Sequence, residues 1–433
     1  MSGAIDVIEK EKLNAIENGD KSLEEYKILH QRGYIKNEED DDKFFNKIMS
    51  LCKKDEESFT SGLNLLLCLT YGCNMRCTYC FQGHKIHNDK NVMTKEQVKS
   101  AFENVEKYII NDFNKKDYMV TLFGGEPLQK QTFDIVLYSI KLAYSKNVYT
   151  NIITNGLELN IFSKELEKYK DKINLQVTLD GIEKIHNKNR LTLNGEKSFQ
   201  RIVENIDDCI LRGLNITLRV NVNEVTSKYL DEFLESFYVK KWVKNKNFSI
   251  DIAPVTQHCN TSNRCNEVIY NETYILDSIL KNVSNINRYL TEKIRFTPDM
   301  YRITGYLRKI SCDFMKKYQI TPVVNFCEAT FLSTFAVGPD NNVYLCPETV
   351  GKTEFSAGTY YPELKLKNEF INQFRDRTVD KMDKCSKCNI AAFCGGGCPM
   401  VSYKLKGNAR KEICGNSREV VEEYLNRISI ELN

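Results

Sequence analysis

The sequence is short of several features that would assign it to a class at once. Its 433 residues include one tryptophan, five histidines and eight prolines, and 61 basic against 58 acidic residues leave a formal charge of only +3. A charge so close to balance gives no electrostatic reason to expect nucleic acid or an acidic membrane as a partner. The first twenty residues lack the apolar core of a signal peptide, and no apolar run is long enough to cross a bilayer. We therefore expect a cytoplasmic protein with neither kind of partner.

Cysteine, in contrast, is abundant. Sixteen cysteines in a cytoplasmic chain are more easily explained as metal ligands than as disulfides. Eleven of them fall into two groups, one at residues 73–80 and one at residues 312–414, and the other five are scattered. The composition is otherwise globular, with 42% hydrophobic and 27% charged residues, and the length suggests two or three domains.

From residue 63 onward, short apolar runs alternate with segments of helical period, which is the pattern of a βα protein. Six runs predict buried strands, at residues 63–69, 118–124, 148–154, 173–179, 215–222 and 248–255. Helices are predicted between some of them, at residues 94–110, 131–146 and 229–241. Parallel strands joined by right-handed crossovers curve into a full or partial barrel, whose functional loops follow the C-terminal ends of the strands. We therefore predict an α/β barrel over residues 63–255.

The flanking regions have a different character. Residues 1–62 are charged and helical in pieces, with an acidic run at 38–42 that is most simply a solvated face. Residues 256–310 read as a loop followed by a helical linker. Residues 311–433 are rich in cysteine and poor in periodicity, which predicts a small domain organised by metal rather than by a hydrophobic core.

The first cysteine group follows the first predicted strand directly. Cys73, Cys77 and Cys80 have x3 and x2 spacing, with the aromatic Tyr79 before the last of them. Three thiolates on one loop can hold three irons of a cubane cluster and leave the fourth iron open. The alternative is a zinc knuckle, but a structural zinc takes four protein ligands, usually as Cys-x2-Cys pairs from two loops. The spacing favours the cluster.

With these motifs, residues 63–255 resemble the core of the radical S-adenosylmethionine (SAM) enzymes, which fold as a partial (βα)6 TIM-like barrel. The resemblance implies a [4Fe-4S] cluster on Cys73, Cys77 and Cys80, and SAM bound beside it. It extends to three strand-end segments and a later arginine. Together with Tyr79 of the cysteine loop, the cofactor-facing residues would be Gly124, Gly125, Glu126, Asn155, Thr178, Asp180 and Arg190. Glycine lets backbone approach a ligand closely, and an arginine fork suits the carboxylate of the cofactor.

The chemistry implied by the resemblance is reductive. An electron from the reduced cluster cleaves SAM, and the resulting 5′-deoxyadenosyl radical abstracts hydrogen from a substrate at the barrel mouth. The protein then supplies positioning and the exclusion of water more than acid–base catalysis. A donor such as flavodoxin or ferredoxin is the expected redox partner.

The second cysteine group resembles the seven-cysteine SPASM domain, which holds two auxiliary [4Fe-4S] clusters in radical enzymes that modify peptides. By position, one cluster would use Cys385, Cys388, Cys394 and Cys414, and the other Cys327, Cys346 and Cys398. Two departures stand out. Asn341 replaces a glycine of the family pattern, although asparagine tolerates positive φ. Cys312 lies farther upstream than expected, so it is either the fourth ligand of the second cluster or a buried thiol that leaves an open iron. Two structural zinc sites are the alternative for the whole group.

The remaining cysteines and histidines carry less information. Cys68 and Cys209 fall within a predicted strand and helix and are expected in the core, Cys52 is unassigned, and Trp242 is most simply a packing residue. A cluster of His258, Cys259 and Cys265 lacks a fourth metal ligand. The other histidines, His30, His84, His87 and His186, form no convincing constellation.

Three functions remain open. The first is a maturase that forms a thioether or another side-chain crosslink in a small, ribosomally made, cysteine-containing precursor peptide, because residues 1–62 resemble the segment where a leader peptide docks in such enzymes. The second is an anaerobic sulfatase-maturing enzyme, which converts cysteine or serine to formylglycine; these usually place aspartate directly after the cysteine that matches Cys346, where this chain has Pro347 and Glu348. The third is a non-catalytic iron-sulfur electron carrier, which would leave the cofactor motifs without a use. We favour the peptide maturase.

Overall fold

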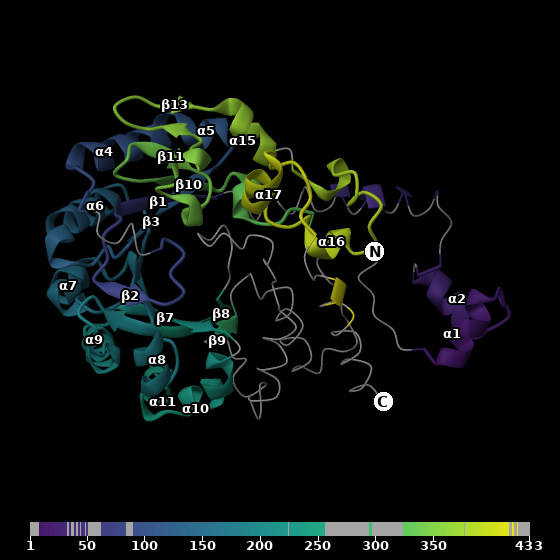
Figure 1. Ribbon diagram of the computed structural model, residues 1–433, viewed down its shortest axis with the longest axis horizontal. Helices are drawn as coiled ribbons and strands as arrows, with labels where there is room; N and C mark the ends of the chain where they lie inside the picture. Colours follow the sequence, from purple (N-terminus) through teal and green to yellow (C-terminus); the bar gives the residue numbers. More distant parts are fainter. Residues whose placement is uncertain are drawn as a thin grey trace.

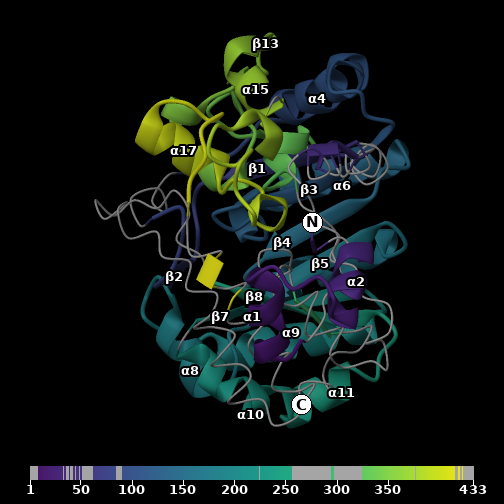
Figure 2. The ribbon, with the colours of Figure 1, turned by 90° about the vertical axis from the view of Figure 1, so that its right-hand side faces the viewer.

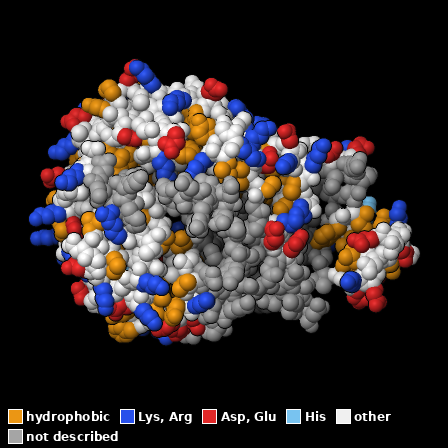
Figure 3. Space-filling model, in the orientation of Figure 1, with side chains coloured by type: hydrophobic (Ala, Val, Ile, Leu, Met, Phe, Trp, Pro, Cys, Tyr) orange, Lys and Arg blue, Asp and Glu red, His pale blue; other side chains and the backbone are white. Residues whose placement is uncertain are grey.

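The computed structural model describes residues 8–32, 62–83, 90–223, 225–255, 294–296, 324–375 and 377–414, with isolated positions among 34–50 and 418–422. Within these residues, no helix has the length and apolar character needed to span a bilayer. Lys and Arg side chains alternate with Asp and Glu over the face shown in Figure 3. This mixture agrees with the near-balance of charge in the sequence.

A curved sheet of parallel strands forms the centre of the molecule (Figure 1). All six predicted strands are confirmed, and they are hydrogen-bonded as parallel neighbours in chain order. Their bounds are β1 Gly62–Thr70, β3 Asp117–Gly124, β4 Thr150–Thr154, β5 Ile173–Thr178, β7 Asn215–Val222 and β8 Phe248–Pro254, and β9 (Ile294–Phe296) continues the sheet beyond β8. The C-terminal ends of these parallel strands therefore share one edge, where the predicted site lies.

Helices cover the outer face of the arc in Figure 1. Their bounds are α4 Lys95–Asn104, α6 Phe133–Ser145, α7 Leu159–Leu166, α8 Glu183–Asn189 and α9 Phe199–Leu211. The helix predicted over 94–110 continues from α4 through a π turn, Val105–Ile109, into α5 (Ile110–Asp112).

The helix predicted over 229–241 is wrong in one respect, because the structure breaks it into two. They are α10 (Leu230–Leu234) and α11 (Phe237–Trp242). Ser236 has extended backbone between them, and its side chain accepts a hydrogen bond from the Val239 N–H, so it caps the second helix. Trp242 is buried, as expected, and its indole N–H donates to Asp207 Oδ1 at 2.8 Å.

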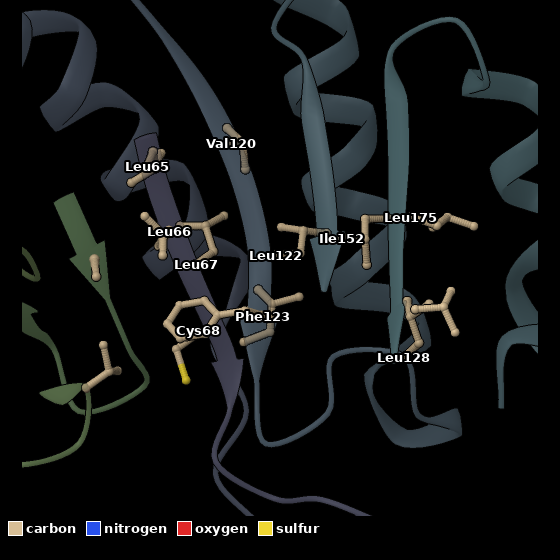
Figure 4. Close-up of a cluster of buried hydrophobic side chains, with 14 of the residues drawn as sticks. Leu65, Leu66, Leu67, Cys68, Val120, Leu122, Phe123, Leu128, Ile152 and Leu175 are labelled. Carbon is tan, nitrogen blue, oxygen red and sulfur yellow. The ribbon is translucent and has the colours of Figure 1, made fainter. Parts of the chain in front are cut away.

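The core between sheet and helices is built from continuous apolar runs. Figure 4 shows side chains of β1, β3, β4 and β5 packed together, and those of Leu65, Leu67, Val120, Leu122 and Ile152 have no exposed surface. Parallel strands buried on both faces read as such runs, which is why the sequence identified them. The predictions that Cys68 and Cys209 lie in the core are confirmed.

The C-terminal region joins the same sheet. β10 (Thr334–Val337) pairs in parallel with β1 on the side away from β3, and β11 (Asn342–Tyr344), β12 (Gly358–Thr359) and β13 (Lys365–Leu366) follow as antiparallel neighbours. Phe335, Tyr344 and Phe374 belong to the barrel's hydrophobic core. The expectation of a region organised by metal instead of a core is therefore wrong for residues 329–374. A smaller apolar cluster that includes Val379 and Met382 underlies the cysteine-rich end.

The other elements are short. Two helices near the N-terminus, α1 (Lys10–Glu17) and α2 (Glu24–Gln31), stand to one side of the body in Figure 1 and lie in front of it in Figure 2. A two-stranded ribbon pairs β2 (Met75–Cys77) with β6 (Arg190–Thr192). The C-terminal helices are α15 Asn368–Arg375, α16 Ala391–Cys394 and α17 Pro399–Lys406. Single 3-10 turns occupy Lys130–Thr132, Glu167–Tyr169, Thr226–Tyr229, Glu328–Phe331, Pro347–Thr349, Thr353–Phe355 and Val379–Lys381.

Candidate functional site

The loop that carries the first cysteine group is fastened to the end of β3. The Gly125 N–H donates to Thr70 O and the Glu126 N–H to Gly72 O, each at 2.9 Å. The amide of Gln129 also donates to Gly72 O at 3.0 Å. These bonds fix the backbone just before Cys73.

Gly124 and Gly125 are required by this contact. A Cβ atom on Gly124 would come within 3.0 Å of Thr70 O, and one on Gly125 would come within 3.0 Å of the carbonyls of both Tyr71 and Gly72. Gly124 also has φ of 145°, which favours glycine. The sequence suggested that these glycines let backbone approach a ligand; the structure shows that they let the cysteine loop approach β3.

We expect alanine at Gly125 to lower the free energy of unfolding by about 3 kcal/mol, because the methyl group would push two backbone carbonyls away. The displaced loop would also bind less iron after reconstitution. Gly195→Ala is the matched control, since Gly195 has φ of 79° but nothing within 4 Å of its added Cβ. That variant is expected to lose about 1 kcal/mol and no iron. Chemical unfolding and iron analysis measure both effects, and equal stability losses in the two variants would contradict the explanation.

The three thiols lie at the carboxyl edge of the sheet, and none is in a disulfide. Cys73 is buried, and its Sγ accepts a hydrogen bond from the Met75 N–H at 3.4 Å. Burial raises the pKa of all three thiols, that of Cys77 to about 11, and the nearby charge of Arg190 opposes the rise at Cys77 and Cys80. Iron would therefore displace a proton from each thiol on binding. Three thiols on one loop, none of them in a disulfide and with a buried cation beside two of them, are the donor set that an iron-sulfur cluster takes.

A buried polar network places Arg190 beside these thiols. Arg190 lies directly across the β2–β6 ribbon from Cys77. Its Nη1 donates to Tyr79 Oη at 2.7 Å, and the Tyr79 hydroxyl donates to Asp180. The amide of Asn221 donates to Tyr79 Oη at 3.1 Å and to Asp180 Oδ1 at 3.2 Å. The predicted residues Tyr79, Asp180 and Arg190 are thus one connected unit, completed by Asn221.

One hydrogen-bond donor of this network makes no hydrogen bond within it. The Nε of Arg190 is buried and has no hydrogen-bond partner among the described residues. A buried, unpaired guanidinium N–H is costly unless a ligand accepts it. Burial alone would lower the pKa of Arg190, but Cys77, Tyr79 and Asp180 outweigh it and raise that pKa well above its usual value. The arginine is therefore a permanent cation with a spare donor, which fits the carboxylate of a bound cofactor.

Glu126 and Asn155 form a second unit on the other side of the loop. The Glu126 carboxylate accepts from Thr154 Oγ1 at 2.6 Å and from the N–H groups of Asn155 at 2.6 Å and Leu128 at 2.8 Å. Burial nevertheless raises the pKa of Glu126 to about 7. The Asn155 amide donates to Asn74 Oδ1 at 2.8 Å and lies 3.9 Å from Cys73 Sγ. Glu126 thus joins the ends of β3 and β4 beneath Cys73.

Thr178 and His186 also belong to the site at the carboxyl edge of the sheet. Thr178 ends β5 and is buried, and the N–H of the next residue, Leu179, donates to Arg219 O at 2.9 Å. His186, to which the sequence gave no role, accepts the Asp180 N–H on Nδ1 at 3.1 Å. Its Nε2 lies 3.0 Å from Ser198 Oγ, which donates to Arg190 O at 2.6 Å. Burial lowers the pKa of His186 well below its usual value, so a neutral imidazole joins the two ends of the Asp180–Arg190 segment.

The distal cysteines divide into two sets by their mutual electrostatic influence. Burial raises the pKa of Cys327 to about 12, with Cys398 the next cause, and raises that of Cys346 well above normal with contributions from Cys398 and Cys327. Burial also raises the pKa of Cys385 to about 11, with contributions from Cys394, Cys414 and Cys388. The assignment of these cysteines to two clusters stays a prediction. Asn341 has φ of 66°, so the expected left-handed turn is present.

The two cysteine groups are connected through Tyr71. A Cβ atom on Gly351, five residues after Cys346, would lie 3.1 Å from the Tyr71 ring, so the ring packs directly on this glycine. The charge of Lys352 is close enough to lower the pKa of Cys80 against the effect of burial. The segment after Cys346 therefore adjoins the loop of the first group. Cys312, Cys52, His84, His87 and the His258, Cys259 and Cys265 cluster lie outside the described residues, and their roles stay predictions.

Part of the chain matches a known protein family, and its fold resembles that of solved structures. Residues 67–237 match the family model of the Radical SAM superfamily. The chain is 26% identical over 351 residues to a cysteine-type anaerobic sulfatase-maturating enzyme of Clostridium novyi (strain NT), covering 75% of this chain and 84% of that protein.

Two solved structures share the architecture. One is native anSMEcpe with bound AdoMet, with a TM-score of 0.59 and 18% identity, covering 86% of this chain and 100% of that chain. The other is Streptococcus suis SuiB bound to precursor peptide SuiA, with a TM-score of 0.54 and 14% identity, covering 87% of this chain and 80% of that chain. At such low identity these matches show the fold alone.

Proposed function

We propose that this chain, whose residues 67–237 match the Radical SAM family model, is a radical SAM peptide maturase. It cleaves SAM to a 5′-deoxyadenosyl radical, which abstracts hydrogen from a ribosomally made precursor peptide and leads to a thioether or another side-chain crosslink. The observation that carries the proposal is the site at the carboxyl edge of the sheet. Three thiols on one loop, none of them in a disulfide, adjoin a buried arginine with an unused donor, and a second cysteine group adjoins that loop.

Each group of residues in the site would have a separate role. Cys73, Cys77 and Cys80 would hold a [4Fe-4S] cluster, which supplies the electron that cleaves SAM when it is bound. Arg190 would donate its Nε–H to the cofactor carboxylate, while Tyr79 and Asp180 hold the guanidinium in place. The strand ends that would form the walls of the SAM site contain Gly124, Gly125, Glu126, Asn155 and Thr178. The last three are buried, which would keep water from the cofactor.

We propose two further clusters on the distal cysteines, which makes three clusters in the protein. Cys385, Cys388, Cys394 and Cys414 would hold one, and Cys327, Cys346 and Cys398 most of the other. The pairwise influences among their thiols group them in this way. Cys312 would either complete the second cluster or leave its last iron open to a cysteine of the substrate. The redox partner would be a donor of the flavodoxin or ferredoxin kind.

Anaerobic sulfatase maturation is the second candidate, and a specific observation favours it. The Clostridium novyi relative carries that name. Two features of this chain favour the peptide maturase. Pro347 and Glu348 follow Cys346, where sulfatase-maturing enzymes usually have aspartate. Residues before the barrel form the helices α1 and α2, where a leader peptide would dock. The SuiB structure, with its precursor peptide, shows the same fold.

The function is tested with the fully reconstituted enzyme under anaerobic reduction. We expect SAM to be converted to 5′-deoxyadenosine, and a co-expressed cysteine-rich peptide encoded beside the gene to lose the mass of two hydrogen atoms. Failure to form 5′-deoxyadenosine would remove the enzymatic proposal altogether. Formation of 5′-deoxyadenosine with no change in the peptide, but conversion of a sulfatase peptide to formylglycine, would establish the second candidate. Mass spectrometry and chromatography separate these outcomes.

A further inference from the structure

A buried arginine lies between the two distal cysteine sets. Arg377 has 1% of its surface exposed, and among the described residues its guanidinium donates to backbone carbonyls. Its Nε donates to Ala409 O at 2.7 Å, and its Nη2 to Gly396 O at 2.7 Å and Lys411 O at 3.2 Å. Its Nη1 donates to Gly395 O at 3.4 Å. The fork is therefore fixed by four carbonyls.

Two of these carbonyls belong to the glycine run that joins one set to the other. Gly395, Gly396 and Gly397 stand between Cys394 and Cys398, and have φ of 68°, 79° and 77°. An added Cβ would come within 3.0 Å of Asn325 O at Gly395 and of Ile413 O at Gly397. Three successive left-handed residues in so tight a space require glycine. This run shapes a loop whose carbonyls accept hydrogen bonds from the guanidinium.

The charge of Arg377 has no carboxylate partner in the described part of the chain. Every hydrogen bond found there for its guanidinium goes to a neutral carbonyl. Burying a cation without a counter-charge is costly. Burial lowers the pKa of Arg377, while the thiols of two residues from each set oppose that change: Cys398 and Cys327, and Cys385 and Cys394. Thiolates in the two cysteine sets would therefore supply negative charge near this cation from both sides.

We propose that Arg377 is a shared internal counter-cation for the two auxiliary cluster sites, which raises the reduction potential at both and holds the loop between them. The proposal rests on the proposed function, because it requires that both sets hold clusters. A fixed positive charge stabilises the more negative, reduced state of each site. Arg377 is a positioning residue, since its donors contact backbone rather than substrate.

The proposal is tested by potentiometric titration of the reconstituted enzyme, followed by electron paramagnetic resonance, in Arg377→Met and Arg377→Lys. We expect Arg377→Met to weaken electron binding at both auxiliary sites by at least about tenfold, a fall of about 59 mV for one electron. Arg377→Lys keeps the charge and should stay near the parent potentials. Lys381→Met is the matched control, because Lys381 lines the same cavity as Arg377 but is exposed, so its charge is screened by water.

The iron content of each variant and of the parent enzyme decides between the remaining outcomes. Loss of the auxiliary iron in Arg377→Met with retention in Arg377→Lys supports the need for a cation. Loss in both variants, unchanged potentials in Arg377→Met, or a shift at one site only would overturn the proposal. A parent enzyme that binds only the iron of the first cluster would instead refute the three-cluster part of the proposed function. The signal of the SAM-binding cluster shows in every case whether the barrel is folded.

Discussion

Alanine in place of Cys77 is expected to reduce 5′-deoxyadenosine formation to the background of iron-free protein. Cys77 supplies one of three thiols on a single loop, and two thiolates cannot hold a cubane cluster whose fourth iron is kept for SAM. The residue also ends β2, directly across from Arg190, so the loss occurs where cofactor and cluster would meet. Iron analysis and chromatography of the anaerobic reaction measure the effect.

Cys209→Ala is the matched control for this variant. Cys209 is fully buried in α9 and is as inaccessible as any thiol of the site, but it lies among apolar side chains. Its replacement is expected to cost about 1 kcal/mol of stability through lost packing, with no change in iron content or product. A Cys77→Ala enzyme that still releases 5′-deoxyadenosine at the rate of Cys209→Ala would contradict the assignment of the first cluster.

The barrel strands were predictable because their environment is uniform. Each parallel strand is covered by helices on one side and by the barrel interior on the other, so Leu65, Leu67 and Leu122 belong to continuous apolar runs. β10 could not be found in this way, since its four residues are too few to show a period. Its placement beside β1 is decided by long-range pairing, which also explains why the C-terminal core was missed.

The candidate site was predictable where a motif carried it and not where partners are distant in sequence. Spacing identified the three cysteines, and the family resemblance named Tyr79, Asp180 and Arg190. Asn221 was missed, although its amide bonds Tyr79 across 142 positions, because a lone asparagine at a strand end has no pattern. His186 was missed for the same reason. Arg377 had no sequence signal of its own. The glycine run at 395–397 is the nearest sequence pattern, and two of its carbonyls accept hydrogen bonds from Arg377.

Arg190→Met is expected to lower both the stability of the barrel and its affinity for SAM. Removing the guanidinium leaves Asp180, which is fully buried, without its cation, and such a loss costs about 3 kcal/mol. If the free Nε binds the cofactor carboxylate, its loss also weakens SAM binding at least about tenfold. Unfolding and equilibrium binding to the cluster-loaded protein measure the two effects separately.

The double variant Arg190→Met with Asp180→Asn separates the structural contribution from the cofactor contact. Its neutral amide no longer requires a cation, so we expect most of the lost stability to return. SAM affinity should stay low, because no neutral side chain restores a charged donor at the position of Nε. Recovery of SAM binding together with stability would show that Arg190 acts only by holding Tyr79 and Asp180. Stability without binding would instead identify the unpaired Nε as the donor that the buried site keeps for its ligand.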